Sequence, residues 1–179
     1  HRIDKGTSGI LVFARTKLAE TSLGKQFKEH SIDRKYYAVV LGKPESVRVE
    51  SNFVGDRGDG FRGTASKKGG IRNNEEGKRA VTHIKVIAND GLHSLVECRL
   101  ETGRTHQIRI HLSELGHPLA GDLVYRTPQV GGEKMPDKSK ANRMLLHAAY
   151  LGFSHPTTGE RMSFTSDLWK AEFSSFIKI

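Results

Sequence analysis

The chain has 179 residues, the length of about one domain, so a second domain is not expected. Its 29 lysines and arginines exceed its 20 acidic residues by nine, which favours a polyanionic partner such as nucleic acid. An anionic membrane surface is the weaker alternative, because no apolar run could span a bilayer and no basic amphipathic stretch carries aromatic anchors. Cys98 is the only cysteine, which excludes an intrachain disulfide and predicts a reducing, cytoplasmic compartment.

The first eleven residues place Asp4 between two basic residues and lead through a Gly/Thr/Ser turn into an apolar stretch. An aspartate in such a turn is either an ordinary surface ion pair or a positioned nucleophile. Local sequence alone favours the ion pair, while the glycines of the turn would let a ligand approach closely. Residues 10–14 are predicted to form a short buried strand. A helix is predicted over residues 17–30, with Thr16 as its cap.

Residues 34–41 are rich in aromatic and β-branched side chains and predict a strand. Alternation along it puts Tyr36, Ala38 and Val40 on one face and the residues between them on the other. An aromatic ring at such a position is usually part of the core. Tyr36 is therefore either a core residue or a ring on which a base could stack.

Residues 51–79 hold seven glycines and seven basic residues but few large apolar ones, which predicts a mobile basic loop. It could be a solvated insertion or an RNA-contacting segment. Two strands follow, over residues 80–88 and 92–101, and the Asn-Asp-Gly sequence between them predicts a hairpin. Cys98 is expected to be a core thiol on the second strand.

Residues 102–112 contain a glycine turn that leaves this strand and enters a helix, with Thr105 as the expected cap. Arg104 then sits at the strand-to-helix corner, a position that suits an anionic ligand. Residues 122–142 are predicted to be a loop, residues 144–153 and 161–165 strands, and Asp167 the cap of a last helix. Strands interrupted by single helices predict an α+β domain around one largely antiparallel or mixed sheet.

Three other kinds of site are disfavoured. His106 and His111 are five residues apart, about 500° around a helix, so they cannot share a metal, and no cofactor is expected. Ser8, His1 and Asp4 lack the strand, elbow and helix of a serine hydrolase. The glycines after Val54 lack the Gly-Lys-Ser/Thr of a phosphate-binding loop.

Three stretches together resemble the RluA-type pseudouridine synthase family, which isomerises uridines in ribosomal or transfer RNA. They are residues 1–9 (His-Arg-Ile-Asp-Lys-Gly-Thr-Ser-Gly), residues 35–40 (Lys-Tyr-Tyr-Ala-Val-Val) and residues 100–111 (Leu-Glu-Thr-Gly-Arg-Thr-His-Gln-Ile-Arg-Ile-His). Residues 116–122, 146–149 and 155–160 continue the pattern. The resemblance runs nearly end to end and implies one catalytic domain over residues 1–179, with the pseudouridine synthase fold but without that domain's N-terminal portion.

The resemblance implies that Asp4 is the nucleophile and that Arg2 lies beside the flipped nucleotide. It assigns the uracil-stacking ring to Tyr36, with Tyr37 as the fallback, and makes Arg104 the ion-pair partner of Asp4. The third stretch supplies further substrate-binding residues: Arg104, Thr105, His106 and Gln107. It also implies an RNA partner, no cofactor and no metal, and we expect a monomer. The competing hypothesis is a catalytically silent RNA-binding protein of the same fold.

Overall fold

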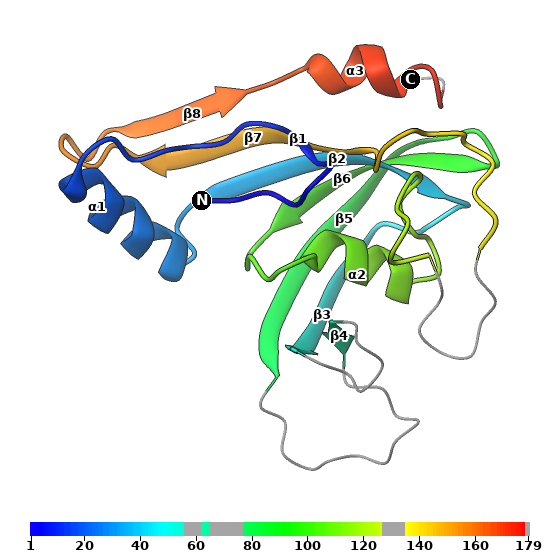
Figure 1. Ribbon diagram of the computed structural model, residues 1–179, viewed down its shortest axis with the longest axis horizontal. Coiled ribbons are helices and arrows are strands. Elements are labelled where there is room, and N and C mark those ends of the chain that lie inside the picture. The colour runs from blue at the N-terminus through cyan, green and yellow to red at the C-terminus, as the bar shows by residue number, and fades with distance from the viewer. Residues whose placement is uncertain (56–61, 65–76, 127–134, 178–179) are drawn as a thin grey trace.

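The computed structural model describes residues 1–55, 62–64, 77–126 and 135–177, and one sheet runs through them (Figure 1). The strands are β1 (Ser8–Gly9), β2 (Asp33–Leu41), β3 (Val47–Val54), β4 (Gly63–Thr64), β5 (Lys78–Asn89), β6 (His93–Leu100), β7 (Leu146–Ser154) and β8 (Arg161–Thr165). The helices are α1 (Lys17–Lys28), α2 (Gln107–Glu114) and α3 (Leu168–Phe173). Among the described helices, none is long and apolar enough to cross a membrane.

The sheet has eight strands in the order β1-β7-β2-β6-β5-β3-β4, and β8 pairs with β7. Every pair is antiparallel except β1 with β7, which is parallel. The sequence predicted an α+β domain with a mixed, largely antiparallel sheet flanked by helices, and this prediction is confirmed. The predicted hairpin is also present, as β5 and β6.

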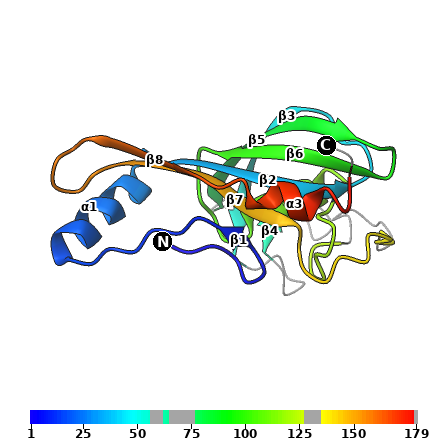
Figure 2. The same ribbon diagram turned by 90° about the horizontal axis from the view of Figure 1, so that it is seen from above.

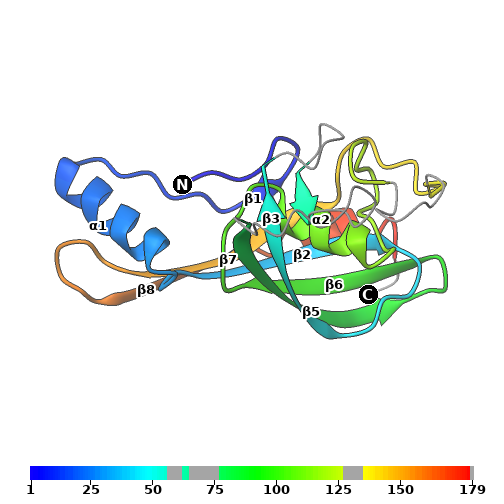
Figure 3. The same cartoon turned by 90° about the horizontal axis from the view of Figure 1, so that it is seen from below.

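The two faces of β2 enter two different cores, as its alternation predicted. Tyr36, Ala38 and Val40 pack with Ile108 and Leu112 of α2. Val39 and Leu41 pack with Trp169 and Phe173 of α3, and Tyr37 packs against the same group. The helices α2 and α3 therefore cover opposite faces of the sheet: Figure 2 shows α3 over one face, and Figure 3 shows α2 over the other.

At one end of the molecule, α1 packs beside the β7–β8 hairpin (Figure 1). Leu23 of α1 forms a third core with Ile32, Leu151 and Phe153. The predicted cap is confirmed, since the Ala19 backbone N–H donates to Thr16 Oγ1 at 3.2 Å. Satisfying this otherwise unpaired N–H stabilises the helix start by about 1 kcal/mol.

Several local predictions are wrong. The predicted strand over residues 10–14 is absent, and in this part of the chain only Ser8 and Gly9 form a strand, which pairs with β7. Thr105 does not cap α2; the residue at the cap position is His106, which makes no side-chain cap bond. Asp167 occupies the cap position of α3 but also makes no such bond.

The segment predicted as a basic loop, residues 51–79, begins inside β3 and includes β4. Polar residues alternate along β3, mostly exposed, so the strand has little of the apolar signal that marks β2. Most of the remaining predicted loop, residues 56–61 and 65–76, lies outside the described residues.

Candidate active site

Asp4 is presented by the turn that enters β1, and this turn is fixed to β7. The Thr7 N–H donates to the Asp4 carbonyl at 3.0 Å, and Arg143 Nη1 donates to the Gly6 carbonyl at 3.1 Å. Gly9 has a φ of +114°, and a Cβ there would lie 2.2 Å from the Ala148 carbonyl oxygen. Only glycine allows both this backbone conformation and this approach, so Gly9 sets the position from which Asp4 reaches the sheet.

The cation beside Asp4 is Arg109, whose Nη1 lies 3.7 Å from Asp4 Oδ2. Arg104 was predicted to be this partner, and that prediction is wrong in the structure: Arg104 Nε donates to the Arg79 carbonyl at 2.8 Å instead. The reason is the start of α2. His106 adopts a left-handed conformation, with φ +59°, so that the helix begins at Gln107 and Arg109 lies in its first turn.

Asp122 holds Arg109 in place from the other side. Arg109 Nε and Nη2 donate to the two Asp122 oxygens at 2.7 and 3.0 Å, which leaves Nη1 facing Asp4. Asp122 in turn accepts from the backbone N–H groups of Val124 and Tyr125. Such a bidentate pair fixes the guanidinium in one plane.

Burial and charge act in opposite directions on this buried pair. Burial disfavours the charge of Arg109, but the hydrogen bonds and negative charge of Asp122 outweigh it and raise the pKa of Arg109. Burial likewise disfavours the Asp122 carboxylate, and the Arg109 hydrogen bonds outweigh it and lower the pKa of Asp122. Both groups therefore stay charged, and Asp4 faces a permanent cation.

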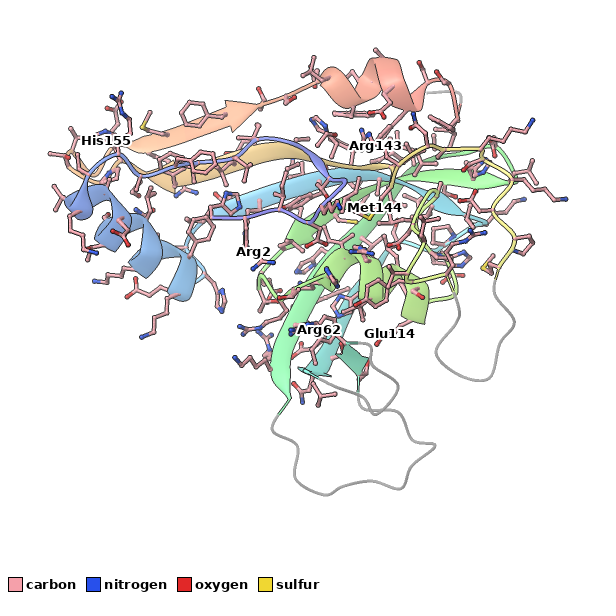
Figure 4. The ribbon with its side chains drawn as sticks, in the orientation of Figure 1. Arg2, Arg62, Glu114, Arg143, Met144 and His155 are labelled. Atoms are coloured by element: carbon pink, nitrogen blue, oxygen red, sulfur yellow. The ribbon has the colours of Figure 1, made fainter. Side chains whose placement is uncertain are left out.

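Asp4 opens into a cleft at the surface of the protein. Residues from four parts of the chain line it: His1, Arg2, Ile3, Asp4, Thr7, Arg34, Tyr36, Leu100, Gly103, Arg104, His106, Gln107, Ile108 and Leu146. Asp4, Tyr36 and Arg104 thus lie in one cleft, as the sequence predicted. Figure 4 shows Arg2 on the N-terminal segment, on the side of the sheet that carries α2.

Tyr36 is both a core residue and a wall of the cleft. Its side chain is 8% exposed and packs in the core under α2, while it also lines the cleft. Burial raises the pKa of its phenol, so the ring is neutral at pH 7. Tyr37 lies on the opposite face, stacked on Trp169 with its hydroxyl donating to Glu97 at 3.0 Å. The structure therefore removes Tyr37 as a candidate for the stacking ring.

The predicted residues of the α2 entry differ in what they can contact. Gln107 lines the cleft, but its amide is used to hold the turn: it donates to the Val81 carbonyl and the Thr82 hydroxyl, and accepts from Thr102 and the Arg104 N–H. Gln107 is accordingly a positioning residue. Thr105 is exposed and is not among the residues that line the cleft.

His106 faces the cleft, and its Nδ1 lies 2.9 Å from the Tyr125 hydroxyl. Its pKa is lowered by burial first; Asp4 opposes this shift and Arg109 adds to it. The imidazole is therefore neutral at pH 7 and offers its other nitrogen to a ligand. His111 instead bonds to Ser51 and Thr82, so the two histidines do lie on different faces of α2.

Sequence reasoning missed Arg109 and Asp122. The available signal was weak. Arg109 stands between the apolar residues Ile108 and Ile110, and an arginine is rarely buried unless an acid pairs with it. An acid able to pair with it had to come from elsewhere in the chain. Nothing in the local pattern identifies Asp122 as that acid.

Comparison with known proteins gives a consistent result. The family model described as RNA pseudouridylate synthase matches residues 1–114. Ribosomal large subunit pseudouridine synthase D of Zymomonas mobilis is 44% identical over 170 residues, covering 94% of this chain and 51% of the relative. The protein of that name from Neisseria meningitidis serogroup A is 42% identical over 172 residues, covering 94% of this chain and 44% of the relative. The chain spans about half the length of these relatives.

Solved structures agree with the fold. Human RNA pseudouridylate synthase domain containing 1 superimposes with a TM-score of 0.73 at 31% identity, over 93% of this chain and 66% of the human one. Human RNA pseudouridylate synthase domain containing 4, at 24% identity, shares the fold with a TM-score of 0.74, over 98% of this chain and 74% of that one. Together with the family model, these likenesses show that the chain belongs to the RNA pseudouridylate synthase family, as its RluA-type motifs predicted.

Proposed function

We propose that the chain carries the catalytic site of an RNA pseudouridine synthase that isomerises uridines in ribosomal or transfer RNA, with Asp4 as the nucleophile. One observation carries the proposal: Asp4 Oδ2 faces the fixed guanidinium of Arg109 at 3.7 Å, in a cleft that Tyr36 also lines. A carboxylate held by a permanent cation in a cleft is suited to nucleophilic or base chemistry. The names of the relatives support the substrate class.

Substrate entry follows from the shape of the cleft. A uridine in folded RNA must leave its stack before a protein can reach its glycosidic bond, which costs a few kcal/mol. Tyr36 offers the extruded uracil a ring to stack on. Arg2, exposed at the edge of the cleft, is placed to fill the space that the base leaves. The basic surface of the chain would hold the phosphates, so RNA binding should weaken with salt.

The reaction is an isomerisation and needs no oxidant or co-reactant. The bond between C1′ and N1 breaks, a bond between C1′ and C5 forms, and the proton displaced from C5 is balanced by the one that N1 gains. Asp4 acts on the ribose by attack at C1′ or by removal of the C2′ proton. Arg109 holds the carboxylate in position in either route, and Gln107 holds the turn that forms the opposite wall.

The direct test is Asp4→Asn assayed with RNA that carries 5-tritiated uridine. Exchange of the C5 proton releases tritium, so the wild type should release it and the variant should not, while RNA binding is kept. Asp33→Asn is the matched control, because Asp33 is an exposed carboxylate paired only with Arg161. Full tritium release by Asp4→Asn would refute the assignment.

The wild type also separates the competing functions. A catalytically silent RNA-binding protein would bind RNA without releasing tritium. A hydrolase would change the mass of its product, whereas isomerisation leaves it unchanged. Mapping pseudouridines in RNA from cells with and without the gene would identify the modified site.

The proposal extends to the setting of the enzyme, a cytoplasmic monomer. The ribosomal large subunit in the names of the relatives supports the compartment. The only cysteine supports it too, since Cys98 is fully buried in the core and burial raises the pKa of its thiol to about 12. Sedimentation equilibrium of the protein with and without RNA would test the monomer.

A further inference from the structure

Another arginine, Arg34, lines the cleft without a counter-ion among the described residues. It belongs to β2, two residues before Tyr36, and lines the same cleft. Its Nε is buried without a hydrogen-bond partner, and among the described residues no carboxylate lies within ion-pair distance of it. Its recorded contact is with the Phe27 ring, 5.9 Å from the guanidinium carbon.

The turn before α2 is shaped around this guanidinium. A Cβ on Gly103 would lie 2.2 Å from Arg34 Nη1 and 3.3 Å from its Cζ, so a side chain there would displace the end of the Arg34 side chain. The backbone of Gly103 is not in the left-handed region, so conformation does not require a glycine there. The absence of a side chain at position 103 leaves room for Arg34 where it lies.

Other cations surround the same spot. Arg104, next to Gly103, lines the cleft, and its side chain donates to the Arg79 carbonyl, while Arg2 stands at the edge of the cleft. The pKa of His30 is lowered by burial and then by the positive charges of Arg104, Arg34 and Arg79. The positive potential at this wall thus extends to a neighbouring side chain.

Burial of an arginine in this position costs free energy unless an anion binds to it. Burial lowers the pKa of Arg34, yet a guanidinium remains protonated at neutral pH. A half-buried charge without a partner destabilises the fold. By contrast, Arg109, behind Asp4, has two carboxylates beside it.

We propose that Arg34, together with Arg104, binds one of the two backbone phosphates that flank the flipped uridine. The inference rests on the proposed function and adds to it the group that positions the nucleotide. Two residues along a strand span roughly 7 Å, so a uracil stacked on Tyr36 has a phosphate of its own strand within reach of Arg34. An arginine fork matches the geometry of phosphate oxygens.

A chemical double-mutant cycle tests this pairing. The probe is a short single-stranded RNA with one central uridine, in which each phosphate is replaced in turn by an uncharged methylphosphonate. Binding is measured for the wild type and for Arg34→Met, which keeps much of the side-chain length without the charge. At one flanking position, neutralisation should weaken wild-type binding about tenfold, as loss of a charged hydrogen bond does. The same replacement should leave Arg34→Met almost unaffected.

Two further variants keep the test decisive. Lys170→Met removes one positive charge from α3, on the opposite face of the sheet, and should lose affinity equally for every methylphosphonate. Gly103→Ala keeps the Arg34 charge but displaces it, so this variant should reproduce the loss of coupling seen in Arg34→Met. Equal losses at every phosphate for wild type and Arg34→Met would overturn the proposal.

Different measurements test the synthase activity and the phosphate site. Tritium release from uridine by the wild type tests the synthase activity and does not depend on Arg34. The cycle measures binding alone and does not depend on turnover. A protein that shows the coupling without releasing tritium would keep the phosphate site and lose the proposed reaction, and the converse result would do the opposite.

Discussion

Two arginines of the candidate site have opposite surroundings: Arg109 pairs with Asp4 behind the cleft, and Arg34 lines the cleft itself. Arg109 and Asp122 are 9% and 1% exposed, joined by two hydrogen bonds, and Asp122 is bound again by backbone N–H groups. Arg34 is half-buried with an unpaired Nε. The first arrangement is complete before any ligand arrives, as expected for groups that must be preorganised. The second is incomplete, as expected for groups whose partner comes with the substrate.

Arg109→Lys should have the largest effect, because it breaks the Arg109–Asp122 pair, which is complete without a ligand. A lysine keeps the charge but cannot bond both Asp122 oxygens while facing Asp4. Leaving the buried Asp122 poorly paired should lower the free energy of unfolding by about 3 kcal/mol. Misplacement of Asp4 should slow tritium release about 100-fold. Urea unfolding and single-turnover assays measure the two losses.

Arg99→Lys is the control for this substitution, since Arg99 is exposed and pairs with Glu97 on the face of the sheet opposite the cleft. It should change both quantities very little. If Arg109→Lys behaved like Arg99→Lys, the position and action of Asp4 would not depend on Arg109.

The attachment of α2 to the sheet should also weaken in acid, because of His111. This histidine of α2 is fully buried and bonds to Ser51 of β3 and Thr82 of β5, and burial lowers its pKa to about 4. The unfolded chain takes up the proton near pH 6.5 and the folded one only near 4. Its contribution is therefore complete above pH 6.5 and is lost as the pH falls to about 4, by up to ~3 kcal/mol.

Urea unfolding of wild type and His111→Asn across this pH range measures the effect. The variant should be less stable at pH 7 but should lose less on acidification. Parallel pH profiles for the two proteins would show that His111 is not the group responsible.

Much of this architecture could be predicted from local sequence. The alternation along residues 34–41 gave the two faces of β2, and Asn89, Asp90 and Gly91 gave the hairpin. The order of the three motifs was enough for the family. Strand pairing could not be predicted, because Ser8 and His147 meet across 139 residues and no local signal encodes that distance.

The Asp4–Arg109 ion pair shows why the site was harder to predict than the fold. Arg104 occupies the corner that the sequence pattern marks, and it does line the cleft. The pairing goes to Arg109 because Gln107 ties the turn to β5 and His106 turns the chain into the helix one residue later than a Thr105 cap would. These are tertiary constraints, which local propensity does not contain.

Arg34→Met should separate stability from binding. Replacing an unpaired, half-buried charge by an apolar chain should leave the free energy of unfolding within about 1 kcal/mol of wild type, or raise it. Affinity for RNA should fall, and the slope of log affinity against log salt should decrease by about one. A loss of stability comparable to that of Arg109→Lys would mean that Arg34 has a structural partner.

Thr105→Ala should have the smallest effect, although Thr105 belongs to the same motif as Arg104 and His106. The side chain is exposed, makes no cap bond to α2 and is not part of the cleft wall. Its removal should change the free energy of unfolding by less than about 0.5 kcal/mol. Tritium release should likewise stay close to wild type. A marked loss of RNA affinity with stability unchanged would place Thr105 in contact with the RNA outside the cleft. The RNA-binding surface would then extend from Arg34 and Arg104 to the outer face of the turn before α2.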